Sequence, residues 1–210
     1  MLLLRHAEAL KNIEDRHGGA GTGLTNNGLQ DCVRIAAFLR EVTQGTTPCL
    51  FGHRVPQVQM TVNSLAGALD LSPIWDERLH GIDLGLLAGL SRDEASQRYP
   101  DSARRLDLWR EGRLRIDELA LPEGESASHF YDRIKSVIVS WNSLAVQRTI
   151  IAVCTRSPLI MFTNIAVMGA SFTFAHYRPY DLAAGSITEL ELASGCLQLK
   201  RLNSCDHLDA

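Results

Sequence analysis

Long apolar runs, an excess of basic charge and paired cysteine motifs are all missing from this sequence. The 210 residues include 21 Lys and Arg against 24 Asp and Glu, which gives a formal net charge of -3. Such a balance leaves no basic face to hold a nucleic-acid backbone or an anionic membrane surface. No stretch approaches the ~20 consecutive apolar residues that a bilayer-spanning helix needs. Neither nucleic acid nor a membrane is therefore expected as a partner.

The cysteines are few, odd in number and widely separated. No two of them form the C-x-x-C pattern of a zinc or redox motif, so they predict free thiols in a reducing compartment. The apolar start, Met1 to Leu4, is short and lacks the basic region and the cleavage site of a signal peptide. We therefore expect a cytoplasmic protein without a cofactor. The five cysteines are Cys32, Cys49, Cys154, Cys196 and Cys205.

Strand-like and helix-like segments alternate along the chain. Apolar or β-branched runs predict strands, and amphipathic spacing behind an N-cap residue or a proline predicts helices. Two runs on either side of Ala193, Ser194 and Gly195 predict a closing hairpin. The predicted strands cover residues 1–5, 48–52, 72–75, 149–155, 186–192 and 196–202, and the predicted helices begin near Thr25, Pro56, Gly124 and Pro158.

The order of these segments predicts a single domain over residues 1–210. Its length and its 45% hydrophobic content are sufficient for a full core. Repeated β-then-α units predict an α/β fold with a mostly parallel sheet and helices on both faces. Between about residues 76 and 122 the pattern breaks into loops and short helices, which predicts a cap insertion over one end of the sheet. In such folds ligands bind outside the carboxyl ends of the strands, here after Leu4, Phe51 and Val153.

Arg5 and His6 stand at the first of these strand ends. A histidine there can attack an electrophile through a ring nitrogen, and an adjacent guanidinium can bind phosphoryl oxygens as a planar fork. By itself, an Arg-His pair more often reflects a strand-end histidine that is hydrogen-bonded into a loop. The motifs elsewhere in the chain decide between these two interpretations.

Four motifs, the first of which contains the Arg-His pair, follow one another along the chain. They are Arg5, His6, Glu8 and Asn12 after the first strand, then Leu24, Thr25 and Gly28, then the run from Asp76 to Gly85, then Gly124, Glu125 and Ser126 with Arg133 beyond them. This set resembles the histidine phosphatase superfamily, the phosphoglycerate-mutase-like proteins, over nearly the whole chain, although Ala7 stands where that family usually has glycine. The resemblance implies the fold predicted above, with His6 becoming phosphorylated and with Arg5 and Asn12 holding the phosphoryl oxygens.

The second loop departs from the family pattern. The family has a Ser-Pro-Leu-x-Arg-Ala motif there, and this chain has His53-Arg-Val-Pro-Gln57. His53 stands at the position of the serine and Gln57 at that of the arginine, so a positive charge is lost. Arg54 could reach the same pocket from one helical turn earlier, and the alternative is an arginine on a solvated loop.

The cap insertion lacks the family's acid, the group that protonates the leaving oxygen. The family pattern Leu-x-Glu-x-x-x-Gly falls on residues 79–85, where Gly81 occupies the position of the acid. His80 could take over, since a histidine titrates near neutrality. Glu77 and Asp83 are further candidates, although loop capping and salt bridging are the more frequent roles of such carboxylates.

The third loop lacks the family's second histidine, which binds the transferring phosphoryl group. Thr155 and Arg156 replace the His-Gly pair expected after the central strand. Threonine cannot carry the positive charge of that histidine. Arg156 supplies a cation if its side chain turns inward, but a shift by one position at a strand end also changes the direction of the side chain.

Two further interpretations concern metals and thiols. His6, His53 and His80 could converge at the mouth of the sheet and bind zinc or another transition metal, but no short-spaced ligand motif supports this and no metal is expected. Cys154 beside Arg156 could be a thiol of lowered pKa. A buried cysteine in a central strand is more often a small hydrophobic residue.

Two functions are compatible with this pattern. The first is a catalytically impaired homologue with a binding, regulatory or accessory role, because losing one preorganised charge donor commonly costs ~10²–10³ in rate. The second is an enzyme with a rearranged site, either a slow phosphohydrolase acting through His6 or a different reaction in the same cleft. The expected partner is a small anionic or phosphorylated ligand, and a homo-oligomer is compatible with both functions. The predicted site residues are His6 and Arg5 as the catalytic pair and Asn12, His53, Arg54, His80, Thr155 and Arg156 as substrate-binding residues.

Overall fold

The order of strands and helices agrees with the segments predicted from the sequence. The structure, a computed structural model, describes residues 1–14, 16–193 and 196–209. No helix in these ranges combines the length and the apolar character that a membrane crossing requires. The strands are β1 (Leu2–Arg5), β2 (Pro48–Gly52), β3 (Pro73–Trp75), β4 (Thr149–Cys154), β5 (Ile187–Ala193) and β6 (Cys196–Ser204). The α-helices are α1 (Leu10–Ile13), α2 (Asn26–Val42), α3 (Pro56–Leu69), α4 (Arg92–Arg98), α5 (Pro100–Arg110), α6 (Ala127–Ala145) and α7 (Arg156–Met168).

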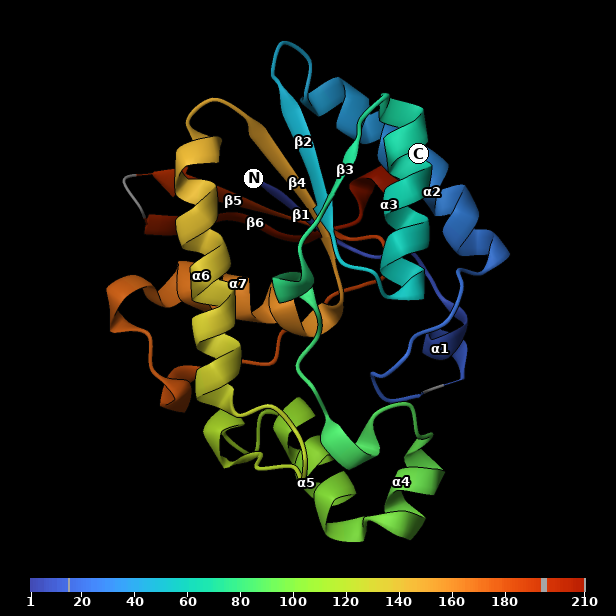
Figure 1. Ribbon diagram of the computed structural model, residues 1–210, viewed down its shortest axis with the longest axis vertical. Coiled ribbons are helices and arrows are strands. Elements are labelled where there is room, and N and C mark those ends of the chain that lie inside the picture. The colour runs from blue at the N-terminus through green and yellow to red at the C-terminus, as the bar shows by residue number, and fades with distance from the viewer. Residues whose placement is uncertain (15, 194–195, 210) are drawn as a thin grey trace.

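The strands form one mostly parallel sheet in the order β3-β2-β4-β1-β5-β6 (Figure 1). The four strands β1 to β4 run parallel to one another, whereas β5 is antiparallel to β1 and β6 is antiparallel to β5. The last two are the strands of the predicted hairpin, whose turn residues Ser194 and Gly195 lie outside the described residues. The prediction of a single α/β domain with a mostly parallel sheet is therefore confirmed.

Helices cover both faces of the sheet because successive residues of a buried strand point to opposite sides. Leu3 of β1 packs in one core with residues of α6 and α7, Trp141 among them. Leu4 packs in the other core with Ile35 of α2 and Leu65 of α3. Figure 1 shows α6 and α7 on one side of the sheet and α2 and α3 on the other. This double burial explains the continuous apolar runs of the central strands.

The start of α2 fixes the loop that follows β1. The hydroxyl of Thr25 accepts a hydrogen bond from the N–H of Gly28 at 3.0 Å and donates one to the Glu8 carboxylate at 2.7 Å. A Cβ on Gly28 would lie 2.1 Å from the carbonyl oxygen of Glu8, so only glycine fits there. The Leu-Thr-x-x-Gly motif thus holds the N-terminal end of α2 against the residues that follow Arg5.

The segment between β3 and α6 lies beyond the carboxyl ends of β1 and β4 (Figure 1). Its beginning is held to α6 by Arg133, which forms an ion pair of 2.6 Å with Glu125 and donates hydrogen bonds to the carbonyls of Arg78 and His80. Only 8% of the Arg133 side chain and 4% of the Glu125 side chain are exposed. The segment contains α4, α5 and the short 3-10 helices Glu77–Leu79, Gly85–Leu87 and Ile116–Glu118.

Candidate functional site

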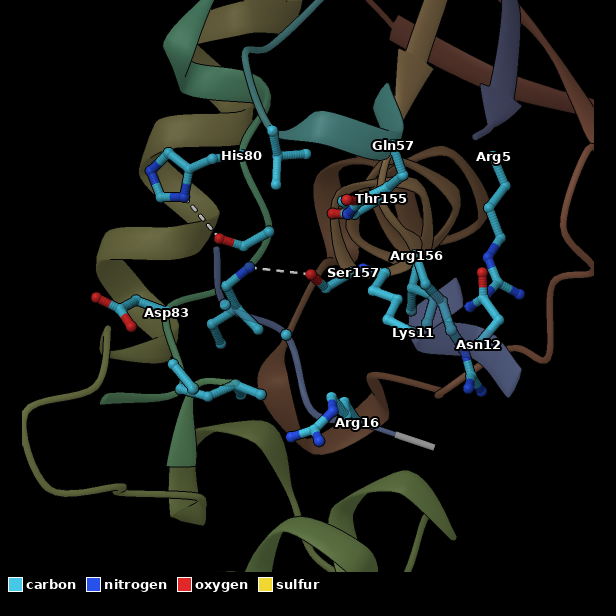
Figure 2. Close-up of a pocket in the computed structure, with 18 of the residues that line it drawn as sticks. Arg5, Lys11, Asn12, Arg16, Gln57, His80, Asp83, Thr155, Arg156 and Ser157 are labelled. Atoms are coloured by element: carbon cyan, nitrogen blue, oxygen red, sulfur yellow. Dashed lines mark hydrogen bonds between the residues drawn. The ribbon is translucent and has the colours of Figure 1, made fainter. Parts of the chain in front are cut away.

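A cavity of about 680 Å³ lies at the carboxyl ends of β1, β2 and β4 (Figure 2). Residues at or just after the ends of these strands line it, such as Arg5, His53 and Thr155, together with Trp109 of α5. Its described lining is rich in positive charge, although the whole chain has a net charge of -3. The cationic side chains are Arg5, Lys11, Arg16, Arg92, Arg110 and Arg156, and the carboxylates are Glu8 and Asp83.

Arg5 and Asn12, the residues that the resemblance assigns to oxyanion binding, both line this cavity. Arg5 donates a hydrogen bond to the carbonyl of Leu182, while its Nε has no partner in the described part of the chain. Burial and then the charge of Arg156 lower the pKa of Arg5 to about 10, so it remains charged at neutral pH. Asn12 accepts the N–H of Ala9 at its Oδ1 at 3.0 Å, which leaves its NH₂ group as a donor.

His6 is buried, with 1% of its surface exposed. Its Nδ1 lies 2.8 Å from the carbonyl oxygen of Ala7. Because a carbonyl only accepts hydrogen bonds, Nδ1 carries the proton and Nε2 keeps an electron pair. Burial and then the charge of Lys11 lower the pKa of His6 to about 3, so the ring is neutral at physiological pH. The protonation state is that of a nucleophile, but His6 is not among the described residues that line the cavity.

Lys11 is a site residue that the sequence interpretation missed. It lines the cavity (Figure 2), and its charge contributes to the lowered pKa of both His6 and His53. Burial and then the charge of Arg5 lower the pKa of Lys11 itself to about 8. Its position next to Asn12 was the one signal in the sequence. Local patterns reveal no more, because how far a lysine is buried depends on how distant segments pack.

The second loop brings His53 and Gln57 to the cavity as neutral groups. Gln57 is 1% exposed, accepts the N–H of Thr22 at its Oε1 at 3.2 Å, and has no described partner for its Nε2. His53 is 6% exposed and its Nε2 also lacks a described partner. Burial and then the charge of His80 lower the pKa of His53 to about 4. The position where the family has its second arginine therefore offers an amide donor.

The structure does not bring Arg54 to the cavity, which corrects the expectation that this residue replaces the lost arginine. Its guanidinium carbon lies 4.9 Å from the centre of the Trp75 ring, and the residue is exposed. The cation–π contact with this ring at the end of β3 draws the side chain away from the carboxyl end of β1. Arg54 is consequently absent from the described lining of the cavity.

Gly81 and Thr155 lie next to each other in the lining of the cavity. A Cβ on Gly81 would lie 3.0 Å from the hydroxyl oxygen of Thr155, closer than most side-chain contacts allow. That hydroxyl has no hydrogen-bond partner in the described chain. Beside it, the Ser157 hydroxyl oxygen accepts the N–H of Ile82 at 2.9 Å. The positions of the family's acid and second histidine are thus neighbours, and both hold small neutral residues.

The three candidate substitutes for the acid differ in position. His80 lines the cavity, with its Nδ1 2.6 Å from the carbonyl oxygen of Gly81. Asp83 lines it too, and its Oδ1 accepts a backbone N–H at 2.9 Å. Glu77 is not part of the described lining. In Figure 2, His80 and Asp83 lie apart from the cationic group around Arg5.

Arg156, at the start of α7, keeps a cation in the third loop. It lines the cavity, and its Nη2 donates a hydrogen bond of 3.3 Å to the carbonyl of Tyr180. Its ion pair with Asp181 spans 3.4 Å, and the Asp181 side chain is 96% exposed. The Nε of Arg156 has no partner among the described atoms. An ion pair with so exposed a carboxylate is weak, so the guanidinium can still bind another anion.

The geometry of the described residues offers little support for a metal-ion site or for a reactive thiol at Cys154. Among the described residues, no group of three histidine, cysteine or carboxylate side chains is arranged to hold a metal ion. Cys154 is fully buried, and burial raises the pKa of its thiol, which makes it unreactive. All five cysteines are free, as predicted.

The family model described as Histidine phosphatase superfamily (branch 1) matches residues 1–205 of the chain. The bifunctional protein Rv2228c of Mycobacterium tuberculosis is 27% identical over 99% of this chain and 54% of its own length. Phosphoserine phosphatase 1 of Hydrogenobacter thermophilus is 24% identical over 76% of this chain and 72% of its own. The chain thus spans about half the length of the first of these relatives.

Solved structures share the fold. The structure of YhfR from Bacillus stearothermophilus superposes with a TM-score of 0.83 at 21% identity, covering 99% of this chain and 98% of that one. At this level of identity the likeness shows the fold alone.

Proposed function

The chain belongs to the histidine phosphatase superfamily, and from this premise we propose that it binds a small anionic or phosphorylated ligand at Arg5 without efficient phosphoryl transfer. In this proposal Arg5, Lys11, Asn12 and Arg156 hold the anion. The role is that of a binding or accessory protein that has kept the fold and the oxyanion-binding start of the motif.

The observation that carries the proposal is that Gly81 and Thr155 are neighbours in the cavity lining, where a Cβ added to Gly81 would lie 3.0 Å from the Thr155 hydroxyl oxygen. Phosphoryl transfer needs a proton at the leaving oxygen and a positive charge near the transferring group. Glycine has no proton to give, and threonine has no positive charge. Since one lost charge donor commonly costs about 10²–10³ in rate, two neighbouring losses predict little hydrolysis.

Ligand binding is supported by the hydrogen-bonding state of the cavity. The Nε atoms of Arg5 and Arg156 are buried and lack partners in the described chain. A buried donor without a partner costs about 1–3 kcal/mol, which an oxyanion between the two guanidinium groups would relieve. The name of one relative, phosphoserine phosphatase 1, supports a phosphate ester as the class of ligand.

An enzyme with a rearranged site is the second candidate, and one observation favours it. The bond between Nδ1 of His6 and the carbonyl of Ala7 leaves Nε2 with the electron pair that attacks a phosphoryl group. Slow phosphohydrolysis, or a different reaction in the same cleft, belongs to this alternative. The exclusion of Arg54 from the described lining weakens it, because that residue was to supply the missing charge.

The proposal also places the protein in the cytoplasm, with no nucleic acid or membrane as partner. Its support is the free state of all five cysteines and the net charge of -3.

Calorimetric titration with inorganic phosphate tests the binding. We expect Arg5→Met to bind about 10- to 100-fold more weakly than wild type, because a hydrogen bond to a charged group contributes about 1.5–3 kcal/mol. Arg54→Met removes the same charge outside the cavity and is the matched control, expected to bind as wild type does. Absence of binding, or equal weakening in both variants, would contradict the proposal. Rapid turnover of a phosphate ester would favour the alternative.

A further inference from the structure

The side chains of Arg5 and Arg156 are directed by one short stretch of backbone. Arg5 donates a hydrogen bond to the carbonyl of Leu182, and Arg156 donates one of 3.3 Å to the carbonyl of Tyr180. Figure 2 shows both arginines on the same side of the cavity as Asn12. The orientation of two cations that the proposed function assigns to the anion therefore depends on residues 178–182, which we call the 178–182 segment.

Regular secondary structure does not hold the 178–182 segment in place. It follows the 3-10 helix Phe174–His176 and precedes β5, and none of the described helices and strands includes it. The N–H of Tyr180 donates to the carbonyl of Arg178 at 3.1 Å, which closes a tight turn across Pro179. Backbone outside a helix or a sheet needs other hydrogen-bond partners to keep a single conformation.

Asn164 of α7 supplies these partners to Arg178. Its Oδ1 accepts the N–H of Arg178 at 2.8 Å, and its Nδ2 donates to the carbonyl of the same residue at 2.9 Å. The Nδ2 also donates to the carbonyl of Ile160 at 2.8 Å, so both amide protons are used. Asn164 is 1% exposed and is not part of the described cavity lining. Bonds to both backbone groups of one residue fix where the 178–182 segment begins.

The other end of the 178–182 segment is anchored to the sheet. The N–H of Ala183 donates to the Oδ1 of Asn203 on β6 at 2.7 Å. The N–H of Gly185 donates to the carbonyl of Arg5 on β1 at 3.2 Å. The end that follows the segment thus keeps its place through the sheet, whereas the end that contains Tyr180 depends on α7.

We propose that the 178–182 segment positions the guanidinium of Arg156 for anion binding, which makes its anchor Asn164 a positioning residue. The inference rests on the proposed function, in which Arg156 holds the anion. The Arg156 side chain is 37% exposed and its ion pair of 3.4 Å leads to the exposed Asp181, so packing alone does not fix its direction. The carbonyl of Tyr180 does, and a cation held in one orientation binds an anion without the entropic cost of being ordered.

Calorimetric titration of Asn164→Leu with inorganic phosphate tests this role. Leucine keeps the branched shape of asparagine but forms none of its hydrogen bonds, and we expect about tenfold weaker phosphate binding. Thr163→Val is the matched control, because it removes the buried hydrogen bond of 2.8 Å to the carbonyl of Leu159 within α7 and leaves the 178–182 segment alone. Its phosphate affinity should be that of wild type. Urea denaturation of both variants establishes that each is folded under the conditions of the titration.

A double-mutant cycle separates positioning from a general loss of stability. We expect Arg156→Met alone to bind phosphate about tenfold more weakly than wild type. If Asn164 acts through Arg156, the double variant Asn164→Leu with Arg156→Met binds about as weakly as Arg156→Met alone. Two independent losses would instead multiply to about 100-fold.

A second pair of variants leaves the core untouched and decides the question even if Asn164→Leu does not fold. Asp181 lies between the two holding carbonyls, and its side chain is 96% exposed. Asp181→Asn and Asp181→Gly both remove the carboxylate, but only glycine gives the backbone more freedom. We expect Asp181→Gly to bind phosphate about two- to fivefold more weakly than Asp181→Asn.

Three outcomes would overturn the inference while the proposed function stands. They are wild-type phosphate affinity in a folded Asn164→Leu, a loss of about 100-fold in the double variant, and equal affinities of Asp181→Gly and Asp181→Asn. Failure of the wild-type protein to bind phosphate is a different result, because it removes the proposed function together with this inference.

Discussion

The loop after β1 and the loops after β2, β3 and β4 line one cavity but differ in what they offer a ligand. The loop after β1 keeps the residues that the family resemblance assigns to oxyanion binding, and it adds a half-buried lysine, Lys11. The other loops hold neutral residues at the positions of the family's arginine, acid and second histidine. We call Arg5, His6, Lys11 and Asn12 the β1 side, although His6 itself is outside the described cavity lining, and Gln57, Gly81 and Thr155 the replaced side.

The difference teaches that the residues at a family's catalytic positions can change while the framework that holds those positions stays. Arg133 still holds the carbonyls of Arg78 and His80 next to Gly81, and its ion pair with Glu125 is buried. The backbone that would carry the acid is therefore anchored, although the acid is gone. A ligand-binding site benefits from such anchoring, because preorganised groups bind a ligand without the entropic cost of being ordered.

The largest expected effect comes from breaking this anchor. Arg133→Met leaves the buried Glu125 with only the exposed His129 as a partner, so we expect the free energy of unfolding to fall by about 3–5 kcal/mol in urea denaturation. Arg113→Met is the control, because its ion pair with Glu111 is 70% and 55% exposed and contributes at most about 1 kcal/mol. If the two variants lose equal stability, the replaced side is not anchored as described.

Rebuilding the replaced side is the second way to sharpen the comparison. We expect Gly81→Glu combined with Thr155→His to raise phosphate-ester hydrolysis by about 10²-fold over wild type, because an acid and a cation return together. Gly81→Glu alone should gain less, because it restores the acid without the cation. A folded double variant without any gain would mean that the β1 side has lost its function too.

His53 gives a test that needs no ligand. Its pKa is lowered to about 4 in the folded protein, against about 6.5 in an unfolded chain, so the unfolded state takes up the proton first as pH falls. Wild type should therefore lose stability between about pH 6.5 and pH 4 relative to His53→Gln, by on the order of 1–2 kcal/mol between pH 7 and pH 5. If the free energies of unfolding of wild type and His53→Gln differ by the same amount at pH 7 and at pH 5, the burial of a neutral His53 is contradicted.

Lys11 gives the smallest expected effect and tests the β1 side. Burial and Arg5 lower its pKa to about 8, so the free protein loses this positive charge as pH rises above about 8. We expect phosphate binding to weaken about fivefold over this rise in wild type, and Lys11→Arg to remove most of the decline because arginine stays charged. If the phosphate affinity of Lys11→Arg falls with rising pH as much as that of wild type, a group other than Lys11 causes the decline.

Much of the fold could be predicted from the sequence. The apolar runs at residues 48–52 and 149–155 and the proline at the start of α3 gave boundaries within about two residues, because local pattern and tertiary packing agree there. Thr25 was predicted as an N-cap, and its hydroxyl accepts the N–H of Gly28. The motif order then placed Arg5 and Asn12 in one cavity.

The details of the site could not be predicted in the same way. Arg54 was expected in the cavity, but a contact with Trp75 on another strand decides its direction. Lys11 was missed because its burial depends on segments distant in sequence. The orientation of the Gln57 amide depends on a single backbone N–H of Thr22, which no sequence pattern encodes.

The most direct test of the account is the rate at which the purified protein hydrolyses p-nitrophenyl phosphate, compared with that of His6→Ala, at concentrations where phosphate binding has been measured. The account predicts equal, background rates for both proteins together with saturable phosphate binding. A wild-type rate well above that of His6→Ala would contradict it, and would show that His6 still transfers phosphoryl groups with a rearranged set of partners.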